Sequence, residues 1–285
     1  MGDVKFRVAA MLEAMVGRRT LVCGARFLLD YARRDFPNRL GQNGEWMVQD
    51  IVVASAGAEP LVVFDVGAHV GLWSKRLLEV AQARAVPVVV HAFEPSEATY
   101  TRLVDNLSAD FAQHIVAVHA AASDRSGRAN LYKVHELAGS NSLHGIAGTT
   151  DGLIVEPVEL ITLDDYCTGA CIEAIDLLES DAEGHDLPVL SGAHHLLENH
   201  AIRVVQFEYN YRWIGARRYL KDAFDFLLPL GYGIGKVTPR AIEWYPAWSP
   251  ELETFREANF VAALPPWSTG FPALQWWNSC SRLPL

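Results

Sequence analysis

The segment from Leu61 to Glu94 constrains the fold of this chain more than any other. Leu61 to Phe64 is a short apolar run rich in β-branched residues, which is typical of a parallel strand buried on both faces. A glycine-containing turn follows, and apolar residues then recur at helical spacing from Leu72. A second buried strand spans Val86 to Phe93. Strand, turn, helix and strand together predict the nucleotide-binding half of a doubly wound α/β sheet.

The turn after the first strand carries residues suited to a ligand. Gly67 and Gly71 let the backbone turn sharply and approach a ligand closely. Glu94 follows the second strand, where an acid commonly hydrogen-bonds ribose hydroxyls. The middle glycine of a G-x-G-x-x-G fingerprint is missing, and Asp65 suits a cationic amino-acid moiety better than a pyrophosphate. The pattern therefore favours S-adenosylmethionine over NAD as the cofactor.

Five successive motifs resemble those of the FkbM family of S-adenosylmethionine-dependent methyltransferases. They are DVGAHVG, AFEPSEATYTRLVDNL, AASDRSG, SDAEGHDLPVLSGA and QFEYN. The resemblance implies a class I methyltransferase, Rossmann-like fold, with a seven-stranded doubly wound sheet and helices on both faces. It also implies, most often, O-methylation of a hydroxyl on a sugar, glycoside or polyketide-type metabolite. The family commonly has a lysine before the Asp of its D-x-E-G motif, whereas this chain has Glu179 and Ser180 in that region.

The motifs and the resemblance together give a set of expected cofactor-binding positions. They are Asp65, Gly67, Ala68, His69, Gly71, Glu94, Pro95, Ser123, Asp124 and Asp181. In class I methyltransferases the end of the third strand faces the adenine, so Ser123 or Asp124 is expected to hydrogen-bond its exocyclic amine, although both also suit a plain turn. Glu45 has two interpretations, a residue beside the cofactor pocket or a first-turn acid favoured by the helix dipole. Asn141 and Ser142 are weaker candidates in a glycine and serine loop.

The catalytic residues are expected at the ends of the strands around 175–178 and 204–207, because ligands bind at the carboxyl edge of such sheets. Methyl transfer to a hydroxyl needs alignment and removal of a proton. The candidates are Asp181, Glu183, His185 and Glu208. We expect His185 or Asp181 to be the base, with Glu183 and Glu208 holding the pocket or substrate hydroxyls. His185 equally suits a structural role in capping the following helix.

Several alternatives stay open at this point. Asp181 and Glu208 suit Mg²⁺, but no third carboxylate stands at a fixed spacing, so no metal is predicted. A methyltransferase-like binding protein without turnover, an N-directed methyltransferase and a nicotinamide-dependent oxidoreductase are the other hypotheses. The four cysteines, Cys23, Cys167, Cys171 and Cys280, form no paired zinc spacing and are interpreted as incidental thiols.

Composition limits the partners. The net charge of −10 and the scattered arginines argue against nucleic acid, which favours a small hydroxylated substrate. No apolar run is long enough for a signal core or a membrane span, so we expect a cytoplasmic protein with no membrane partner. A homo-oligomer is possible, because the aromatic segment 240–255 suits a lid, a substrate wall or a dimer contact.

The predicted organisation has three parts. Residues 1–58 form an N-terminal helical cap, with Val8, Met11, Leu12 and Met15 at helical spacing. Residues 59–264 form the S-adenosylmethionine-binding core, which closes with strands at 231–237 and 258–264. Residues 265–285 form a C-terminal tail that packs on the body or on a partner.

Overall fold

Five parallel strands with apolar sequences form the centre of the fold. The structure, a computed structural model, describes residues 2–35, 41–145 and 152–277. The central strands are β1 (Leu61–Val66), β2 (Val88–Phe93), β3 (Ile115–Val118), β7 (Ile175–Ser180) and β8 (Ile202–Tyr209). All described residues of β7 are buried, as expected for a strand covered on both faces. The predicted strand, turn, helix and strand at the start of the core is present.

The described main sheet has nine strands rather than the predicted seven. Its order is β12-β10-β9-β11-β8-β7-β1-β2-β3, with β9 (Gly233–Thr238), β10 (Ala241–Tyr245), β11 (Ala258–Ala263) and β12 (Ala273–Gln275). The extra strands are β10 and β12, which extend the edge beyond β9. Thr238 pairs with Ala241, so only two residues connect β9 and β10.

The first part of the aromatic segment 240–255 is therefore built into the sheet as β10. Trp244 and Tyr245 lie on β10 and are buried, on opposite faces of the strand as its alternation requires. They are core residues, not a lid over the site. The tail pairs β12 with β10 and buries Trp276, so this part of it packs on the same chain.

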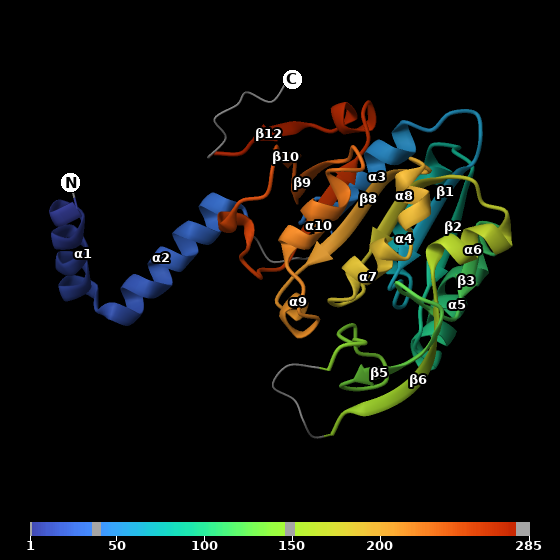
Figure 1. Ribbon diagram of the computed structural model, residues 1–285, viewed down its shortest axis with the longest axis horizontal. Helices are drawn as coiled ribbons and strands as arrows, with labels where there is room; N and C mark the ends of the chain where they lie inside the picture. Colours follow the sequence, from blue (N-terminus) through green and yellow to red (C-terminus); the bar gives the residue numbers. More distant parts are fainter. Residues whose placement is uncertain (1, 36–40, 146–151, 278–285) are drawn as a thin grey trace. The chain divides into compact units, whose positions relative to one another are not determined.

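Helices cover both faces of the main sheet. One face carries α3 (Glu45–Ala54), α4 (Leu72–Ala83) and α5 (Glu97–Phe111), and the other carries α6 (Leu163–Ala170), α7 (Asp186–Ser191), α8 (His194–Glu198) and α10 (Leu220–Leu227). The short α9 (Arg212–Gly215) follows β8, and two 3-10 turns, η1 (Pro250–Leu252) and η2 (Trp267–Gly270), flank β11. This arrangement, visible in Figure 1, confirms the predicted α/β class with helices on both faces.

A second, smaller sheet occupies the region where the strand and helix alternation is interrupted. It consists of β4 (Ala121–Ala122), β5 (Gly127–Lys133) and β6 (Ile154–Ile161), in the order β4-β6-β5. β5 and β6 pair in antiparallel register, and Figure 1 shows them beside the main sheet near α9.

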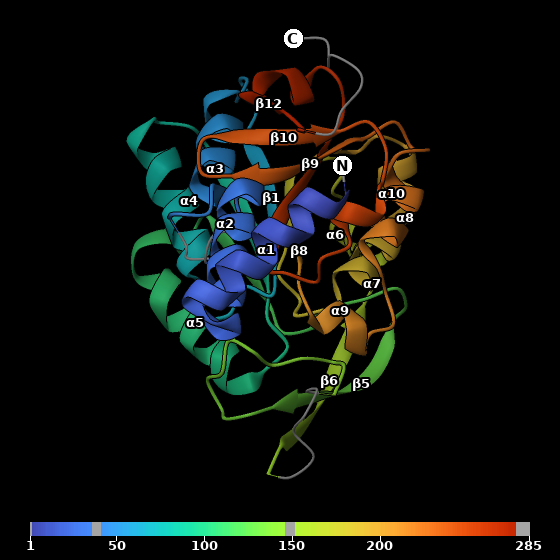
Figure 2. The same ribbon diagram turned by 90° about the vertical axis from the view of Figure 1, so that its left-hand side faces the viewer.

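The chain divides into two compact units, residues 1–38 and 39–285. The first contains α1 (Gly2–Val16) and α2 (Arg18–Arg33), joined by Gly17 (Figure 2). The predicted cap extended to residue 58, but α3 belongs to the second unit, where it packs against α4. Among the described residues, no helix has both the length and the hydropathy that crossing a bilayer requires.

A glycine is required at position 67 for two reasons: its backbone is left-handed, and the backbone just past β7 lies very close to it. Its φ is 86°, and a Cβ at this position would lie 2.1 Å from the backbone oxygen of Asp181. We expect Gly67→Ala to lower the free energy of unfolding by about 2 to 4 kcal/mol, because both the left-handed backbone and the contact become strained. Urea denaturation measures this. Gly57→Ala is the matched control, since its Cβ would meet nothing within 4 Å. Equal stability of the two variants would contradict this account.

Candidate active site

The candidate site lies where the order of the parallel strands reverses. β1 lies between β2 and β7, so the chain leaves β1 toward one edge and returns toward the other. Ligands bind outside the carboxyl ends of strands at such a switch point. The backbone N–H of Asp181, just past β7, donates to the carbonyl of Val66 at 2.9 Å. The ends of β1 and β7 are thus held together.

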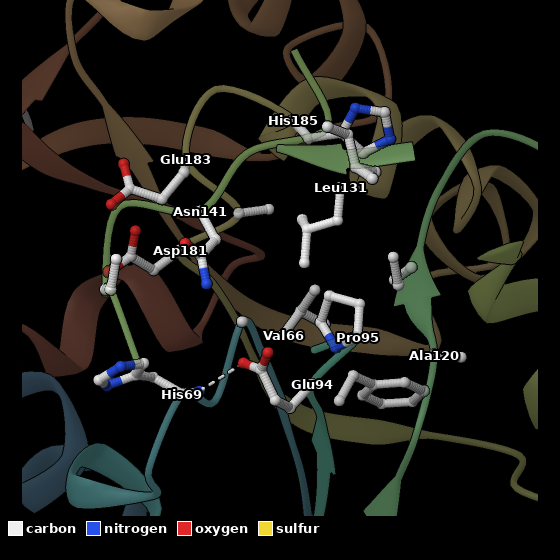
Figure 3. Close-up of a pocket in the computed structure, with 18 residues that line it drawn as sticks. Val66, His69, Glu94, Pro95, Ala120, Leu131, Asn141, Asp181, Glu183 and His185 are labelled. Atoms are coloured by element: carbon white, nitrogen blue, oxygen red, sulfur yellow. Dashed lines mark hydrogen bonds between the residues drawn. The ribbon is translucent and has the colours of Figure 1, made fainter. Parts of the chain in front are cut away.

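A hollow of about 560 Å³, part of it open to solvent, occupies this edge. Its predicted lining residues are Gly67, His69, Glu94, Pro95, Asn141, Asp181, Glu183 and His185. Its remaining lining is mostly apolar and was not predicted: Val66, Phe93, Ala120, Ala121, Ala122, Leu131, Ala138, Gly139, Leu143 and Ala182. Figure 3 shows Asp181 and Glu183 on one side of the hollow and Leu131 and His185 on the other. The hollow therefore has an acidic side and a largely apolar side.

Glu94 is fixed at the floor of the hollow by the backbone. One carboxylate oxygen accepts from the backbone N–H of His69 at 3.0 Å, a bond drawn in Figure 3, and the other accepts from Ser96 N–H at 2.9 Å. Burial raises the pKa of Glu94 to about 7. The structure thus places Glu94 in the lining of the hollow with a fixed orientation, and its contact with ribose stays a prediction.

Of the predicted residues around the first turn, Gly67 lines the hollow, whereas Gly71 and Asp65 lie outside its lining. Gly71, with φ 82°, lets α5 approach, since a Cβ there would meet the Leu103 and Leu107 side chains. Asp65 is buried, accepts from Ser74 Oγ at 2.5 Å, and lies beside Glu179 in the register of β1 and β7. Burial raises the pKa of Asp65 to about 6 and raises that of Glu179 well above its usual range.

Ser123 and His185 form a hydrogen-bonded chain along the apolar side of the hollow. Ser123 Oγ lies 2.9 Å from His185 Nε2 and donates to Asp124 at 3.2 Å, and His185 Nδ1 lies 2.9 Å from His144 Nε2. Burial lowers the pKa of His185 to about 3, so its ring is neutral near pH 7. Both ring nitrogens already have partners, which leaves no free acceptor for a substrate proton. Sequence reasoning had no signal for the contact with His144.

Asp181 and Glu208 form a carboxyl pair at the acidic side. Glu208 is buried, which raises its pKa well above the usual range, whereas the Asp181 side chain is exposed and its pKa is raised by partial desolvation. Their shared hydrogen bond lowers the pKa of Asp181 and raises that of Glu208. Asn210 Nδ2 donates to Glu208 at 2.5 Å. Of the two carboxyls, Glu208 therefore holds a proton more tightly than Asp181.

Glu183 and Asp186 complete this region. Arg212 Nε lies 2.7 Å from a carboxylate oxygen of Glu183, so Glu183 is engaged by an ion pair. One oxygen from each of Asp181, Glu183 and Glu208 lies within 4.8 Å of the others, which supplies the third carboxylate that sequence spacing did not reveal. Asp186, not predicted, accepts from Ser180 Oγ and from the backbone N–H of Ala182 and Gly184, and so shapes the loop that presents Asp181.

Glu45 belongs to the same acidic region. It begins α3, is buried, and accepts hydrogen bonds from Asn43 and, at 2.7 Å, from Asn259 on β11. Its burial and the nearby Asp181 raise its pKa to about 7. Glu45 is therefore more than an exposed first-turn acid, and it adds to the negative charge beside Asp181.

The sequence of this chain matches the model of one protein family. The family model described as the methyltransferase FkbM domain matches residues 65–234. This chain is a member of the FkbM methyltransferase family. The match runs from the end of β1 to the start of β9 and includes Asp181, Glu208 and Glu94. No curated protein matches the sequence.

Solved structures similar to this chain include methyltransferases. A methyltransferase FkbM from Methylobacillus flagellatus KT is 16% identical, with a TM-score of 0.46, and the match covers 75% of this chain and 47% of that one. The chain thus spans about half of that protein. A putative methyltransferase from Streptococcus mutans in complex with SAH is 8% identical, covering 78% and 98% of the two chains, with a TM-score of 0.44. The magnesium protoporphyrin IX methyltransferase from Synechocystis PCC 6803 with bound SAM is 14% identical, covering 77% of each chain, with a TM-score of 0.40.

The raised pKa of Glu45 makes stability depend on pH. The folded state binds a proton more tightly than the unfolded chain, so the stabilisation is complete below the unfolded pKa of about 4.3 and is lost as pH rises to about 7. Glu45→Gln keeps an acceptor oxygen and cannot ionise. We expect its free energy of unfolding to fall less than the wild type's between pH 5 and pH 8, by urea denaturation. The exposed Glu79→Gln should follow the wild type, and parallel curves for all three proteins would contradict the assignment.

Proposed function

We propose that this methyltransferase uses S-adenosylmethionine to methylate a hydroxyl of a small metabolite. The observation that carries the proposal is Asp181, an exposed carboxyl that is hydrogen-bonded to Glu208 and lines the hollow whose floor is Glu94. A hydroxyl acceptor needs a base, whereas a neutral amine attacks through its own lone pair. The presence of a positioned base therefore favours O-methylation over N-methylation.

The lining of the hollow fits the parts of this cofactor. The apolar side, with Phe93, Leu131 and the alanines of β4, suits a flat adenine ring. Glu94 presents a fixed carboxyl to the ribose hydroxyls, and the acidic side attracts the cationic end of the molecule. When bound, S-adenosylmethionine supplies an electrophilic methyl group on a sulfonium. Ser123 and Asp124 stay predictions for the adenine amine.

Asp181 is the base in this proposal. It accepts the proton of the acceptor hydroxyl while that oxygen forms its bond to the methyl carbon. Glu208 donates to Asp181 and is itself held by Asn210, so the carboxylate has one fixed orientation. Arg212 forms an ion pair with Glu183, whereas no cation of the described residues lies at hydrogen-bond distance from Asp181 on the same side of the hollow. Alignment by this fixed floor contributes the remaining acceleration.

Cofactor binding is tested first. We expect Glu94→Ala to weaken binding of S-adenosylhomocysteine by about 10- to 100-fold, because hydrogen bonds to a charged group contribute roughly 1.5 to 3 kcal/mol. Isothermal titration calorimetry measures this, with NAD as the competing ligand and the exposed Glu97→Ala as the matched control. Binding of NAD instead of the adenosyl compound would contradict the proposal.

A second test compares substitutions of the two members of the proposed catalytic pair, Asp181 and Glu208. We expect Asp181→Asn to lower kcat by about 100-fold or more, because general-base catalysis contributes roughly 10² to 10⁴. Glu208→Gln should be much milder, since the amide still donates to Asp181. Release of S-adenosylhomocysteine, measured with a panel of hydroxylated metabolites, gives kcat. Equal effects of the two substitutions would argue against Asp181 as the base.

A metal-assisted reaction is the second candidate, favoured by the three converging carboxylates of Asp181, Glu183 and Glu208. A divalent cation there would acidify the hydroxyl and replace the base. The same assay separates the two mechanisms. Full activity after treatment with EDTA supports Asp181 as the base, whereas loss of activity that Mg²⁺ restores supports the cation.

A further inference from the structure

The side chain of Asn141 has no hydrogen-bond partner in the part of the chain that the structure describes. Asn141 lines the hollow, and its Oδ1 is shielded from solvent. A shielded polar atom without a hydrogen bond is unfavourable, and such atoms are rare in native proteins. The stability of the fold therefore does not explain an asparagine at this position, whereas a ligand that completes its hydrogen bonds does.

The residues on both sides of Asn141 are fixed to the body of the protein. Ser140 O accepts a hydrogen bond from Arg212 Nη1 at 3.1 Å, and Ser142 Oγ donates to Glu183 O at 2.8 Å. The backbone at Asn141 is thus tied to α9 on one side and to the loop after β7 on the other. A side chain on a backbone that is held in this way is preorganised for a ligand.

Ser142, the neighbouring candidate from the sequence, is engaged inside the protein. Besides donating to Glu183 O, its Oγ accepts a hydrogen bond from the backbone N–H of His144 at 3.1 Å, and the residue is buried. The hydroxyl of Ser142 therefore holds the loop. The amide of Asn141, by contrast, has both its donor and its acceptor available for a ligand.

Asn141 lies on the acidic side of the hollow. Figure 3 shows its side chain beside Asp181 and Glu183, with the amide nitrogen toward the open space. The apolar side, where the adenine is proposed to bind, is formed by Leu131, His185 and their neighbours. The position of Asn141 beside the proposed base therefore favours a contact with the methyl acceptor over a contact with the adenine.

The groups around the amide restrict what it can bind. The Asn141 Nδ2 is a donor, and the carboxyl oxygens of Asp181 and Glu183 are acceptors. A hydroxyl between them can accept from the amide and donate to a carboxyl, whereas a carbonyl can only accept. A carboxylate would be repelled by the acidic side. The ligand group that fits this place best is therefore a hydroxyl.

We propose that Asn141 holds the methyl acceptor through a second hydroxyl next to the one that is methylated, so that the acceptor is a vicinal diol of the kind that a sugar ring carries. This inference rests on the proposed function, because it takes Asp181 as the base for the first hydroxyl. The Asn141 Nδ2 donates to the oxygen of the second hydroxyl, which in turn donates to Glu183. Asn141 is thus a specificity-determining residue and takes no proton.

Pairs of acceptors that differ by one hydroxyl test the proposal. The probes are methyl glucoside with its monodeoxy counterparts, and vicinal cyclohexanediol with cyclohexanol. We expect the wild type to prefer the diol of a pair by at least about tenfold in kcat/KM, because a site that hydrogen-bonds a hydroxyl discriminates against the analogue without it. Asn141→Ala should reduce this preference to about twofold or less, mainly by raising KM for the diol.

Two further variants serve as controls. Asn141→Leu keeps the size of the side chain but has no hydrogen-bonding group, so it should lose the preference as Asn141→Ala does. Asn130→Ala removes an exposed asparagine of β5 outside the lining of the hollow, and it should match the wild type with every acceptor. Binding of S-adenosylhomocysteine, measured by calorimetry, should stay within about twofold of the wild type in all three variants, which also shows that they are folded.

Three outcomes would overturn the inference. An equal loss of kcat/KM for both members of each pair in Asn141→Ala means that Asn141 only shapes the hollow, and the proposed function stands. Binding of S-adenosylhomocysteine that weakens in Asn141→Ala as in Glu94→Ala means that Asn141 contacts the cofactor instead. A wild type that binds S-adenosylhomocysteine but methylates no hydroxyl of the panel contradicts the proposed function, and the inference about Asn141 falls with it.

Discussion

The close approach of β1 and β7 at their carboxyl ends is the constraint on which the site depends. Gly67 leaves room for the backbone of Asp181, whose N–H bonds Val66. The register that follows places Asp65 beside Glu179 and brings the Asp181 loop over the turn that carries His69. His69 N–H in turn orients Glu94. One backbone contact thus sets the distance between the floor of the hollow and its acidic side.

Carboxyl groups gather at this edge at an energetic cost. Burying a charge away from water is unfavourable, and well-packed apolar residues in the same volume are often more stable. The chain reduces the cost by sharing protons: Asp65 is paired with Glu179, and Asp181 with Glu208. A stability argument does not explain why so many acids gather here, whereas the proposed attraction of a cationic ligand and removal of a proton do.

The parts of the fold and site that could be predicted are those that depend on short, local sequence patterns. The apolar strand, the glycine turn and Glu94 follow each other within 34 residues, so their spacing identified the floor of the hollow. β10 was missed because its aromatic, proline-flanked sequence resembles a loop, and only pairing with β9 makes it a strand. The contact between His144 and His185 joins residues 41 positions apart, and the protonation of Glu208 depends on its neighbours in space. Such facts need the folded structure.

The sequence left open whether His185 or Asp181 is the base. The geometry of the site distinguishes between these two residues. A base must be charged or have a free lone pair, and it must face the reacting atoms. His185 is neutral, with both nitrogens engaged, on the side of the hollow where Leu131 and the alanines lie. Asp181 lies on the opposite side with Glu183 (Figure 3). His185 thus links the loop of His144 to Ser123 and shapes the apolar wall, which favours the carboxyl of Asp181 as the proposed base.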